Sequence, residues 1–261
     1  MIIDQNSNNN QAILTKIVED GDFPRYLYKY TTLDSLELIL KSSSLKFSKP
    51  SEFNDPFDCN ITIDTNNTSE EIETYIESLK QNRKLEASEI ETLRQKFHNP
   101  KDLFLLTNQS VKNAKESFGI SCFSKNDKNI VMWAHYADKN KGACLKFDIL
   151  ADTDFFMTPF FVNYKVNYPK FNYINNRNEV GRFLLETKSD EWAYEKEIRV
   201  MKQGHGFYCF LKESLIEIIF GVHSSKTKRD KIKYFARKNN FNSSSFKTCR
   251  ISETKFELEI V

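Results

Sequence analysis

Glycine and proline are scarce in this sequence, with 7 and 6 residues among 261, and no stretch rich in glycine, proline or serine marks a linker between domains. The five cysteines are odd in number, widely dispersed and without a Cys-x-x-Cys pair, which argues against a disulfide framework or a zinc site. The four histidines also lack the spacing of metal ligands. We therefore expect no structural metal.

Long hydrophobic runs are absent as well. The longest candidates, residues 155–162 and 215–220, have the length of a strand, whereas a bilayer span needs roughly 20 residues. The first residues, MIIDQNSNNN, lack the basic start and apolar run of a signal peptide. With 38 basic and 36 acidic residues, the chain has no global field that attracts nucleic acid or an anionic membrane. We expect a cytoplasmic protein with no membrane partner.

Aromatic residues are abundant, with 22 Phe and 11 Tyr, and they indicate a core built on rings. The length stays within the range of one large domain. Short strand patterns alternate with helix patterns but lack regular βαβ spacing. This predicts an α+β fold with a mixed, mostly antiparallel sheet and flanking helices. We expect residues 1–22 to form an N-terminal arm and residues 23–261 to form a single domain.

The coarse element pattern places the motifs discussed below. Strands are predicted at residues 26–32, 45–48, 59–64, 117–124, 142–148, 160–166, 197–201, 216–222, 246–251 and 255–260. Helices are predicted at residues 33–42, 129–138, 179–187 and 227–238. Two more helices start at capping boxes, Thr68 with Glu71 and Ser88 with Glu91, inside a helical insertion at about residues 66–116.

The first block with chemical potential is Tyr28-Lys29-Tyr30. Strand alternation sends the two tyrosines to one face and Lys29 to the other. A tyrosine pair on a sheet face is usually core. Its functional alternative is a stacking platform for a flat heteroaromatic ring, with the hydroxyls at the edge.

The second block is the loop Phe53-Asn54-Asp55-Pro56-Phe57. Asn and Asp before Pro typically make side-chain-to-backbone turns, so a structural role is one interpretation. In the other, Asn54 or Asp55 points into a cleft from a loop that the two rings anchor.

The third block contains Ser124 at the end of a strand, followed by Trp133, His135 and Tyr136 in a short helix. Trp133 and Tyr136 are three residues apart and share a helix face, while His135 points elsewhere. Ser124 either caps the next helix or binds a ligand oxygen. His135 is either a surface residue or a base.

The fourth block runs from Trp192 to Arg199 and contains the acidic sequence Glu195-Lys196-Glu197. On a strand, Glu195, Glu197 and Arg199 would share one face. Trp192 and Tyr194 favour partial burial, and a buried carboxylate needs a partner, so we expect Arg199 to pair with one glutamate and leave the other available. An exposed charge ladder is the alternative. We expect the four blocks to line a single cleft around this acidic run.

Taken in order, LYKY, FNDPF, MWAHYAD, GACLKFD, WAYEKEIR and IIFGVHS resemble a widespread bacterial family, domain of unknown function 2971. The resemblance covers roughly residues 26–260, and it implies that residues 66–116 are the variable part. The family carries no assigned reaction.

The layout is also similar, more distantly, to the ADP-ribosyltransferase fold, in which a late strand supplies a catalytic glutamate, often as Glu-x-Glu. This resemblance implies that Glu197, beside Glu195, stabilises the ribose cation formed when nicotinamide leaves NAD. It also implies that Tyr28 or Tyr30 stacks on nicotinamide and that Ser124 touches the ribose. The sequence departs from the fold's familiar classes, because the first strand has neither their His nor their Arg and no Ser-Thr-Ser triplet occurs.

Three functions fit these residues. The first is an NAD-consuming ADP-ribosyltransferase-like or glycohydrolase effector, of a toxin or of antiphage defence, with NAD as substrate. The second is a protein that binds or processes nucleic acid through the basic segment 226–238, unless that segment is an ordinary solvated helix face. The third is a non-catalytic domain that senses a ligand or binds a partner. The basic segment contains Lys226, Lys228, Arg229, Lys231, Lys233, Arg237 and Lys238 beside Tyr234.

Overall fold

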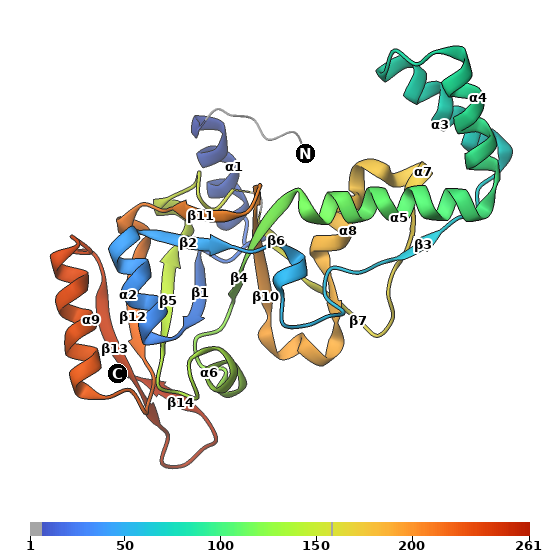
Figure 1. Ribbon diagram of the computed structural model, residues 1–261. Coiled ribbons are helices and arrows are strands. Elements are labelled where there is room, and N and C mark those ends of the chain that lie inside the picture. The colour runs from blue at the N-terminus through green and yellow to red at the C-terminus, as the bar shows by residue number, and fades with distance from the viewer. Residues whose placement is uncertain (1–6, 158) are drawn as a thin grey trace. The chain divides into compact units, whose positions relative to one another are not determined.

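The computed structural model describes residues 7–157 and 159–261, and the chain forms two compact units (Figure 1). Unit 1 comprises the chain up to Ser48, then Gly119–Val162 and Glu191–Val261. Unit 2 comprises Lys49–Phe118 and Asn163–Asp190. The helices of the expected insertion at residues 66–116 fall in unit 2. The division into an arm and a single domain stays a prediction.

Unit 1 contains most of the strands. Its α-helices are α1 (Ser7–Glu19), α2 (Leu33–Ser42), α6 (Ile130–Tyr136) and α9 (Lys226–Lys238). Its strands are β1 (Tyr26–Thr31), β2 (Ser44–Phe47), β4 (Phe118–Ser124), which starts on the last residue of the first segment of unit 2, β5 (Ala143–Asp148), β6 (Pro159–Phe161), β10 (Glu197–Gln203), β11 (Gly206–Cys209), β12 (Leu215–Phe220), β13 (Ser245–Ile251) and β14 (Leu258–Ile260). Short 3-10 helices are η2 (Ile149–Ala151), η4 (Asp190–Glu195), which starts on the last residue of unit 2, and η5 (Lys212–Ser214).

Eight of these strands form one sheet in the order β14-β13-β12-β5-β1-β4-β10-β6. Strand β1 is antiparallel to both β5 and β4, with Tyr28 opposite Lys146 on one side and opposite Ser124 on the other. Strands β12 and β13 are parallel, and helix α9 connects them. The predicted α+β class with a mixed, mostly antiparallel sheet and flanking helices is therefore confirmed.

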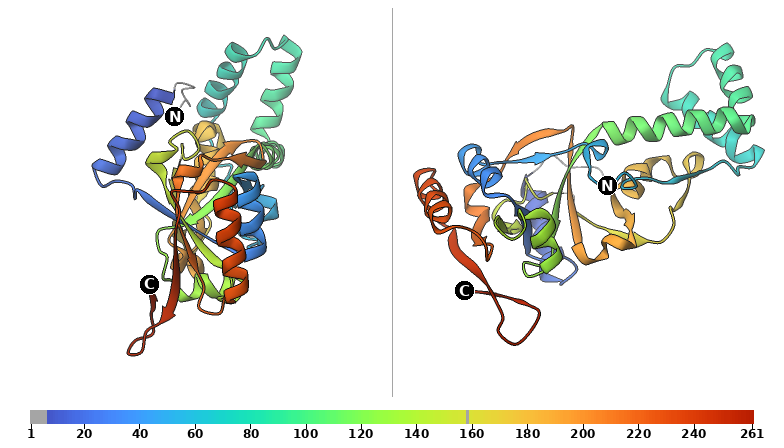
Figure 2. Two further views of the ribbon diagram at one scale, coloured as in Figure 1. Left: turned by 90° about the vertical axis from the view of Figure 1, so that its left-hand side faces the viewer. Right: turned by 60° about the horizontal axis from the view of Figure 1, so that its bottom comes forward.

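The sheet has a different apolar cluster on each face. Leu145 belongs to the larger cluster with helices α2 and α9, which lie side by side in Figures 1 and 2. Its neighbour Cys144 belongs to the smaller cluster with Trp133 of helix α6. Successive residues of a strand point to opposite faces, so α2 and α9 cover one face and α6 covers the other. The rings of Phe123, Phe147 and similar residues fill the larger cluster, as the aromatic composition predicts.

Helix α2 shows how local sequence defines an element. Thr32 is its N-cap, and its side chain accepts a hydrogen bond from the backbone N of Ser35. The helix ends at Ser43, which adopts a left-handed conformation and donates its N–H to the carbonyl of Ile39. The apolar spacing buries Leu33, Leu36 and Leu40, as periodicity predicts.

Unit 2 is mainly helical. Its elements are η1 (Pro50–Glu52), β3 (Thr62–Asp64), α3 (Ser69–Asn82), α4 (Ala87–His98), α5 (Pro100–Glu116), β7 (Asn163–Lys165), β8 (Lys170–Asn172), α7 (Tyr173–Asn176), η3 (Arg177–Glu179), α8 (Val180–Glu186) and β9 (Thr187–Ser189). Two short parallel pairs, β3 with β8 and β7 with β9, join its two chain segments. A separate cluster around Ile76, Phe97 and Leu103 forms its core.

Several predicted boundaries were wrong. The capping box Thr68–Glu71 is present at α3, but α4 starts at Ala87 with Glu86 as N-cap, whose N–H donates to Glu89 Oε2 at 2.8 Å, so Ser88 is already inside the helix. The predicted strand 160–166 is split into β6 and β7, which belong to different sheets.

No helix in the described part of the chain is long and apolar enough to cross a membrane.

Candidate functional site

Strand β1 places its two tyrosines on the face covered by α6, as alternation predicts, but their surroundings differ. Tyr30 is a core residue. Its ring meets Trp133 edge-on with 5.3 Å between centroids, and its hydroxyl donates to the carbonyl oxygen of Asn126 at 2.7 Å. Tyr28 keeps intermediate exposure beside that cluster, and burial raises its pKa well above the usual value, with Asp127 adding to the rise. Tyr28 is therefore the tyrosine with surface left for a ligand.

Lys29 points to the opposite face of the sheet. Its Nζ donates to Ser121 Oγ and to the carbonyl oxygen of Cys122, both at 3.0 Å, and lies 5.0 Å from the centroid of the Phe123 ring. Desolvation lowers the pKa of Lys29, and the charges of Cys122 and Glu197 oppose that change. The structure thus separates Lys29 from the Tyr28 surface.

Ser124 links strand β4 to the acidic run. Its Oγ donates to the carbonyl oxygen of Glu195 at 2.6 Å and accepts from the N–H of Asn126. Of the two alternatives for Ser124, capping of the following helix is excluded, because Asn129 caps that helix through Oδ1, and a contact with a ligand oxygen stays a prediction. Asn129 also donates from Nδ2 to the carbonyl of Tyr194 at 2.6 Å. Its position directly before an apolar helical run was the pattern that could have identified it.

The three candidate residues of helix α6 have different surroundings. Trp133 is 0% exposed and its indole N–H donates to the carbonyl of Asp127 at 2.7 Å, so the expected ligand-binding role gives way to a core role. His135 is exposed, with its ring centroid 6.3 Å from that of Tyr194. Tyr136 donates its hydroxyl to Glu195 Oε1 at 2.6 Å.

The acidic run is not a continuous strand. Glu195 ends η4, Lys196 adopts a left-handed conformation with φ of 46°, and β10 starts at Glu197. The expected alternation therefore fails at Glu195. It holds from Glu197 onward, since Ile198 and Val200 lie in the cluster under α2 and α9 while Glu197 and Arg199 alternate with them.

Both carboxylates are buried and anchored. Glu195 is 3% exposed and Glu197 is 4% exposed. Arg199, which is fully buried, donates from Nε to Glu197 Oε1 at 2.8 Å and from Nη2 to Glu197 Oε2 at 3.2 Å. The prediction that Arg199 pairs with one glutamate is confirmed, and that glutamate is Glu197. The expectation that pairing leaves the other glutamate available was wrong, because Tyr136 anchors Glu195.

The second block lies in unit 2. Asp55 is buried and its Oδ1 accepts from the N–H of Phe57 at 2.9 Å, which is the predicted local turn. Its Oδ2 is buried without a hydrogen-bond partner among the described residues. Asn54 is exposed. The blocks that the structure brings together are therefore the first, third and fourth, where Trp192 lies with its ring centroid 6.0 Å from that of Tyr194.

Most cations of helix α9 have structural contacts. Lys231 pairs with Glu37 of α2 at 2.7 Å, and Lys228 lies 3.9 Å from Asp34. Arg237 donates to three backbone carbonyls beyond the helix end, and Arg229 donates to the carbonyl of Ser224. Lys233 and Lys238 lie near the rings of Phe246 and Tyr234, and Lys226 starts the helix. These contacts favour the interpretation of a helix that packs on α2 with a solvated outer face.

The fold and these residues define an α+β protein with two anchored carboxylates, Glu195 just before strand β10 and Glu197 at its start. Residues 132–200, which include Trp133, Tyr136, Glu195 and Glu197, match the family described as "Protein of unknown function (DUF2971)". The match supports the resemblance to this family over that segment. No curated protein and no solved structure matches the chain.

No group of three or more His, Cys, Asp or Glu within residues 7–157 and 159–261 could hold a metal ion.

Proposed function

We propose that unit 1 cleaves the bond between ribose and nicotinamide in NAD, as a glycohydrolase or an ADP-ribosyltransferase-like enzyme. The observation that carries this proposal is the bidentate pair between Glu197 and Arg199, which is buried on β10, the strand beside the edge strand β6 of the sheet. A guanidinium is permanently charged, so it favours the charged form of the carboxylate that it faces. Glu197 is thereby a negative charge with a fixed position.

The chemistry needs such a charge. When the C1′–N bond of NAD breaks, its electron pair leaves with neutral nicotinamide and positive charge develops on the ribose ring. Water or an acceptor then forms a bond to C1′ and loses a proton. A preorganised carboxylate beside the ribose stabilises the transition state, in which the ribose is positively charged, more than the ground state, in which the ribose is uncharged. This difference is the requirement for catalysis.

Neighbouring residues would position the substrate. Tyr28 lies opposite Ser124 on the same face of the sheet, and Ser124 hydrogen-bonds the carbonyl of Glu195. We assign to the half-buried ring of Tyr28 the stacking contact with nicotinamide. Tyr136 would keep Glu195 in place beside Glu197.

A second candidate is a non-catalytic ligand-binding domain, of a sensor or a partner-binding protein. It is favoured by the hydrogen bonds with Tyr136 and Arg199 that hold the two carboxylates within the protein. Nucleic-acid binding through residues 226–238 has less support, because the contacts of Lys231 and Arg237 explain much of that basic segment.

The proposal is tested by incubating the purified chain with NAD and measuring the released nicotinamide by chromatography. We expect turnover in the wild type and a loss of at least 100-fold in Glu197→Gln, with an unchanged circular dichroism spectrum. The matched control is Glu217→Gln, a carboxylate of the same sheet that pairs with Lys247 at 3.6 Å, and it should keep full activity. NAD binding without release in the wild type would favour the ligand-binding domain, and equal rates in wild type and Glu197→Gln would refute the role of Glu197.

A further inference from the structure

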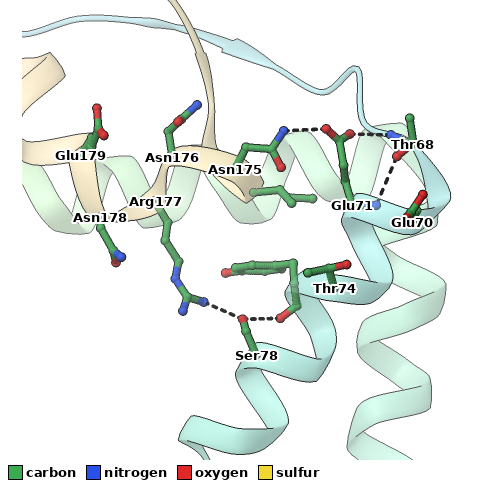
Figure 3. A pocket seen from close by; sticks show the side chains of 12 residues that line it. Thr68, Glu70, Glu71, Thr74, Ser78, Asn175, Asn176, Arg177, Asn178 and Glu179 are labelled. Atoms are coloured by element: carbon green, nitrogen blue, oxygen red, sulfur yellow. Dashed lines mark hydrogen bonds between the residues drawn. The ribbon is translucent and has the colours of Figure 1, made fainter.

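A cavity of about 520 Å³ lies in unit 2 between helix α3 and residues 174–179 (Figure 3). Its volume is within the range of about 300–1,000 Å³ that is typical of small-ligand sites. Hydroxyl, amide and charged side chains line much of it, and none of them belongs to the four blocks described above. The cavity is a candidate site of its own.

Arg177 defines one end of this cavity. Its side chain extends toward Ser78 of α3, and Nη1 donates to Ser78 Oγ at 3.2 Å (Figure 3). The guanidinium lies 5.1 Å from the centroid of the Tyr75 ring. Ser78 donates its own proton to the carbonyl of Tyr75 at 2.6 Å, which leaves its oxygen oriented to accept. Burial raises the pKa of Tyr75 and the neighbouring guanidinium opposes the rise.

The guanidinium of Arg177 has donors to spare. Among the described residues, Ser78 accepts a hydrogen bond from Nη1, the Tyr75 side chain also interacts with the guanidinium, and no carboxylate pairs with it. Arginine presents a planar fork of N–H groups that matches a carboxylate in two parallel hydrogen bonds. A guanidinium that is stacked on a ring and oriented by a serine is therefore a preformed anchor for a carboxylate.

The other end of the cavity is negative. Glu70 lies at the start of α3, eight residues before Ser78, which corresponds to about 12 Å along a helix. Figure 3 shows Glu70 and Arg177 on opposite sides of the lining. Glu71 differs from Glu70, because its two oxygens accept from the N–H of Thr68 and from Asn175 Nδ2, both at 2.8 Å. Glu71 is thus part of the helix cap, whereas Glu70 is exposed at the rim.

Side-chain amides complete the lining. Asn176 and Asn178 flank Arg177 in sequence, both are exposed, and neither side chain has a hydrogen-bond partner in the part of the chain that the structure describes. An amide side chain offers two donors and one acceptor, the same groups that a peptide unit requires.

Charge narrows the ligand class. The lining contains one guanidinium, of Arg177, and three carboxylates, of Glu70, Glu71 and Glu179. A phosphate dianion would be repelled by that excess of negative charge, since like charges at short range are unfavourable. A molecule with a carboxylate at one end and an ammonium at the other has no such cost.

We propose that this cavity binds a short peptide, with its C-terminal carboxylate on Arg177 and its N-terminal ammonium directed to Glu70. An extended chain spans at most about 3.3–3.6 Å per residue, so a distance of about 12 Å corresponds to three or four residues.

Calorimetry with a mixture of tripeptides of randomised side chains, and with its C-terminally amidated and N-terminally acetylated counterparts, tests the proposal on the full chain. We expect the free mixture to bind and each blocked form to bind at least tenfold more weakly. Arg177→Gln should remove the preference for carboxylate over amide, and Glu70→Gln should remove the preference for ammonium over acetyl.

Two matched variants serve as controls. Arg182→Gln changes an arginine of unit 2 that pairs with Glu186, and Glu77→Gln changes a carboxylate of α3 outside this cavity, so both should keep both preferences. Absence of binding by the free mixture, or equal binding of the three forms, would overturn the proposal. Retention of the carboxylate preference in a folded Arg177→Gln chain would overturn the assigned orientation.

Discussion

The hydroxyl of Tyr136 donates a hydrogen bond to Oε1 of Glu195 at 2.6 Å, across 59 positions of the sequence. The donor lies at the end of α6 and the acceptor at the end of η4, so this bond fixes the acidic run against the helix that covers one face of the sheet. Glu195 is buried, and a buried carboxylate depends on such donors.

Replacement of Tyr136 by phenylalanine should therefore destabilise the chain. Hydrogen bonds to charged groups contribute about 1.5–3 kcal/mol, and we expect a loss of that order in the free energy of unfolding measured with urea. Tyr168→Phe is the control, because Tyr168 is 42% exposed, and it should change the free energy of unfolding by less than about 0.5 kcal/mol. If Tyr136→Phe leaves the urea midpoint of unfolding unchanged, this hydrogen bond has no stabilising role.

Arg199 and Glu197 should show strong energetic coupling. Removal of one member of a buried pair leaves an uncompensated charge and costs about 3–5 kcal/mol, so Arg199→Met and Glu197→Leu should each reduce stability by that amount. The double variant should lose clearly less than the sum, as a double-mutant cycle in urea would measure. The exposed pair Arg250 and Glu259 provides the comparison, and its coupling should be about 0–1 kcal/mol. Additive losses at Arg199 and Glu197 would show that the two side chains do not interact.

The two tryptophans should be distinguishable by fluorescence. Trp133 is fully buried, whereas Trp192 has intermediate exposure. In Trp192→Phe the remaining emission, from Trp133, should be blue-shifted and resistant to quenching by acrylamide. In Trp133→Phe the remaining emission, from Trp192, should be quenched more easily.

Trp133→Ala should reduce the free energy of unfolding by about 3–5 kcal/mol, the usual range for truncation of a buried tryptophan. Equal quenching of the two single-tryptophan variants would be inconsistent with the burial of Trp133.

Stability should decline in alkaline solution through Cys249. Burial, with a smaller effect of Asp127, raises the pKa of its thiol to about 12 from the ordinary 9.0. The folded chain then keeps this proton at a pH where the unfolded chain releases it, so the stabilising contribution is full below about pH 9 and is lost as the pH rises toward 12. Urea midpoints at pH 8 and pH 10.5 should fall less in Cys249→Val than in the wild type. Cys209→Val, at an exposed position, should follow the wild type, and an identical decline in all three chains would contradict the contribution of Cys249.

The elements that sequence predicts well are those defined by local interactions. Thr68 caps α3 as its spacing with Glu71 predicts, and alternation correctly separates Tyr28 from Lys29. The failures are non-local. Residues 160–166 have the composition of one strand, yet the chain pairs Phe161 with Ile198 of β10 and Tyr164 with Lys188 of β9. Pairing partners decide that division, and composition carries no information about them.

The candidate site shows the same limit. Burial of the acidic run was predictable from Trp192 and Tyr194, and an arginine partner for one carboxylate followed from the cost of burying charge. The choice of Glu197 over Glu195 depends on the left-handed turn at Lys196, a residue type without a preference for that conformation. The cavity around Arg177 was missed entirely, because its lining comes from two segments about a hundred residues apart, residues 68–78 of α3 and its N-cap and residues 174–179 of α7 and η3, each of which is ordinary polar sequence by itself.

The bridge between Ser48 and Ile120 has a consequence for how chain length can vary. The two residues exchange backbone hydrogen bonds, at 2.9 Å from Ser48 N and 2.8 Å from Ile120 N, so unit 1 holds together both ends of the segment 49–118. The entropy of closing a loop changes slowly with its length, and a segment with fixed ends can grow or shrink without a shift in the strands that hold it. Relatives with very different numbers of residues between these two positions could therefore share the same sheet register.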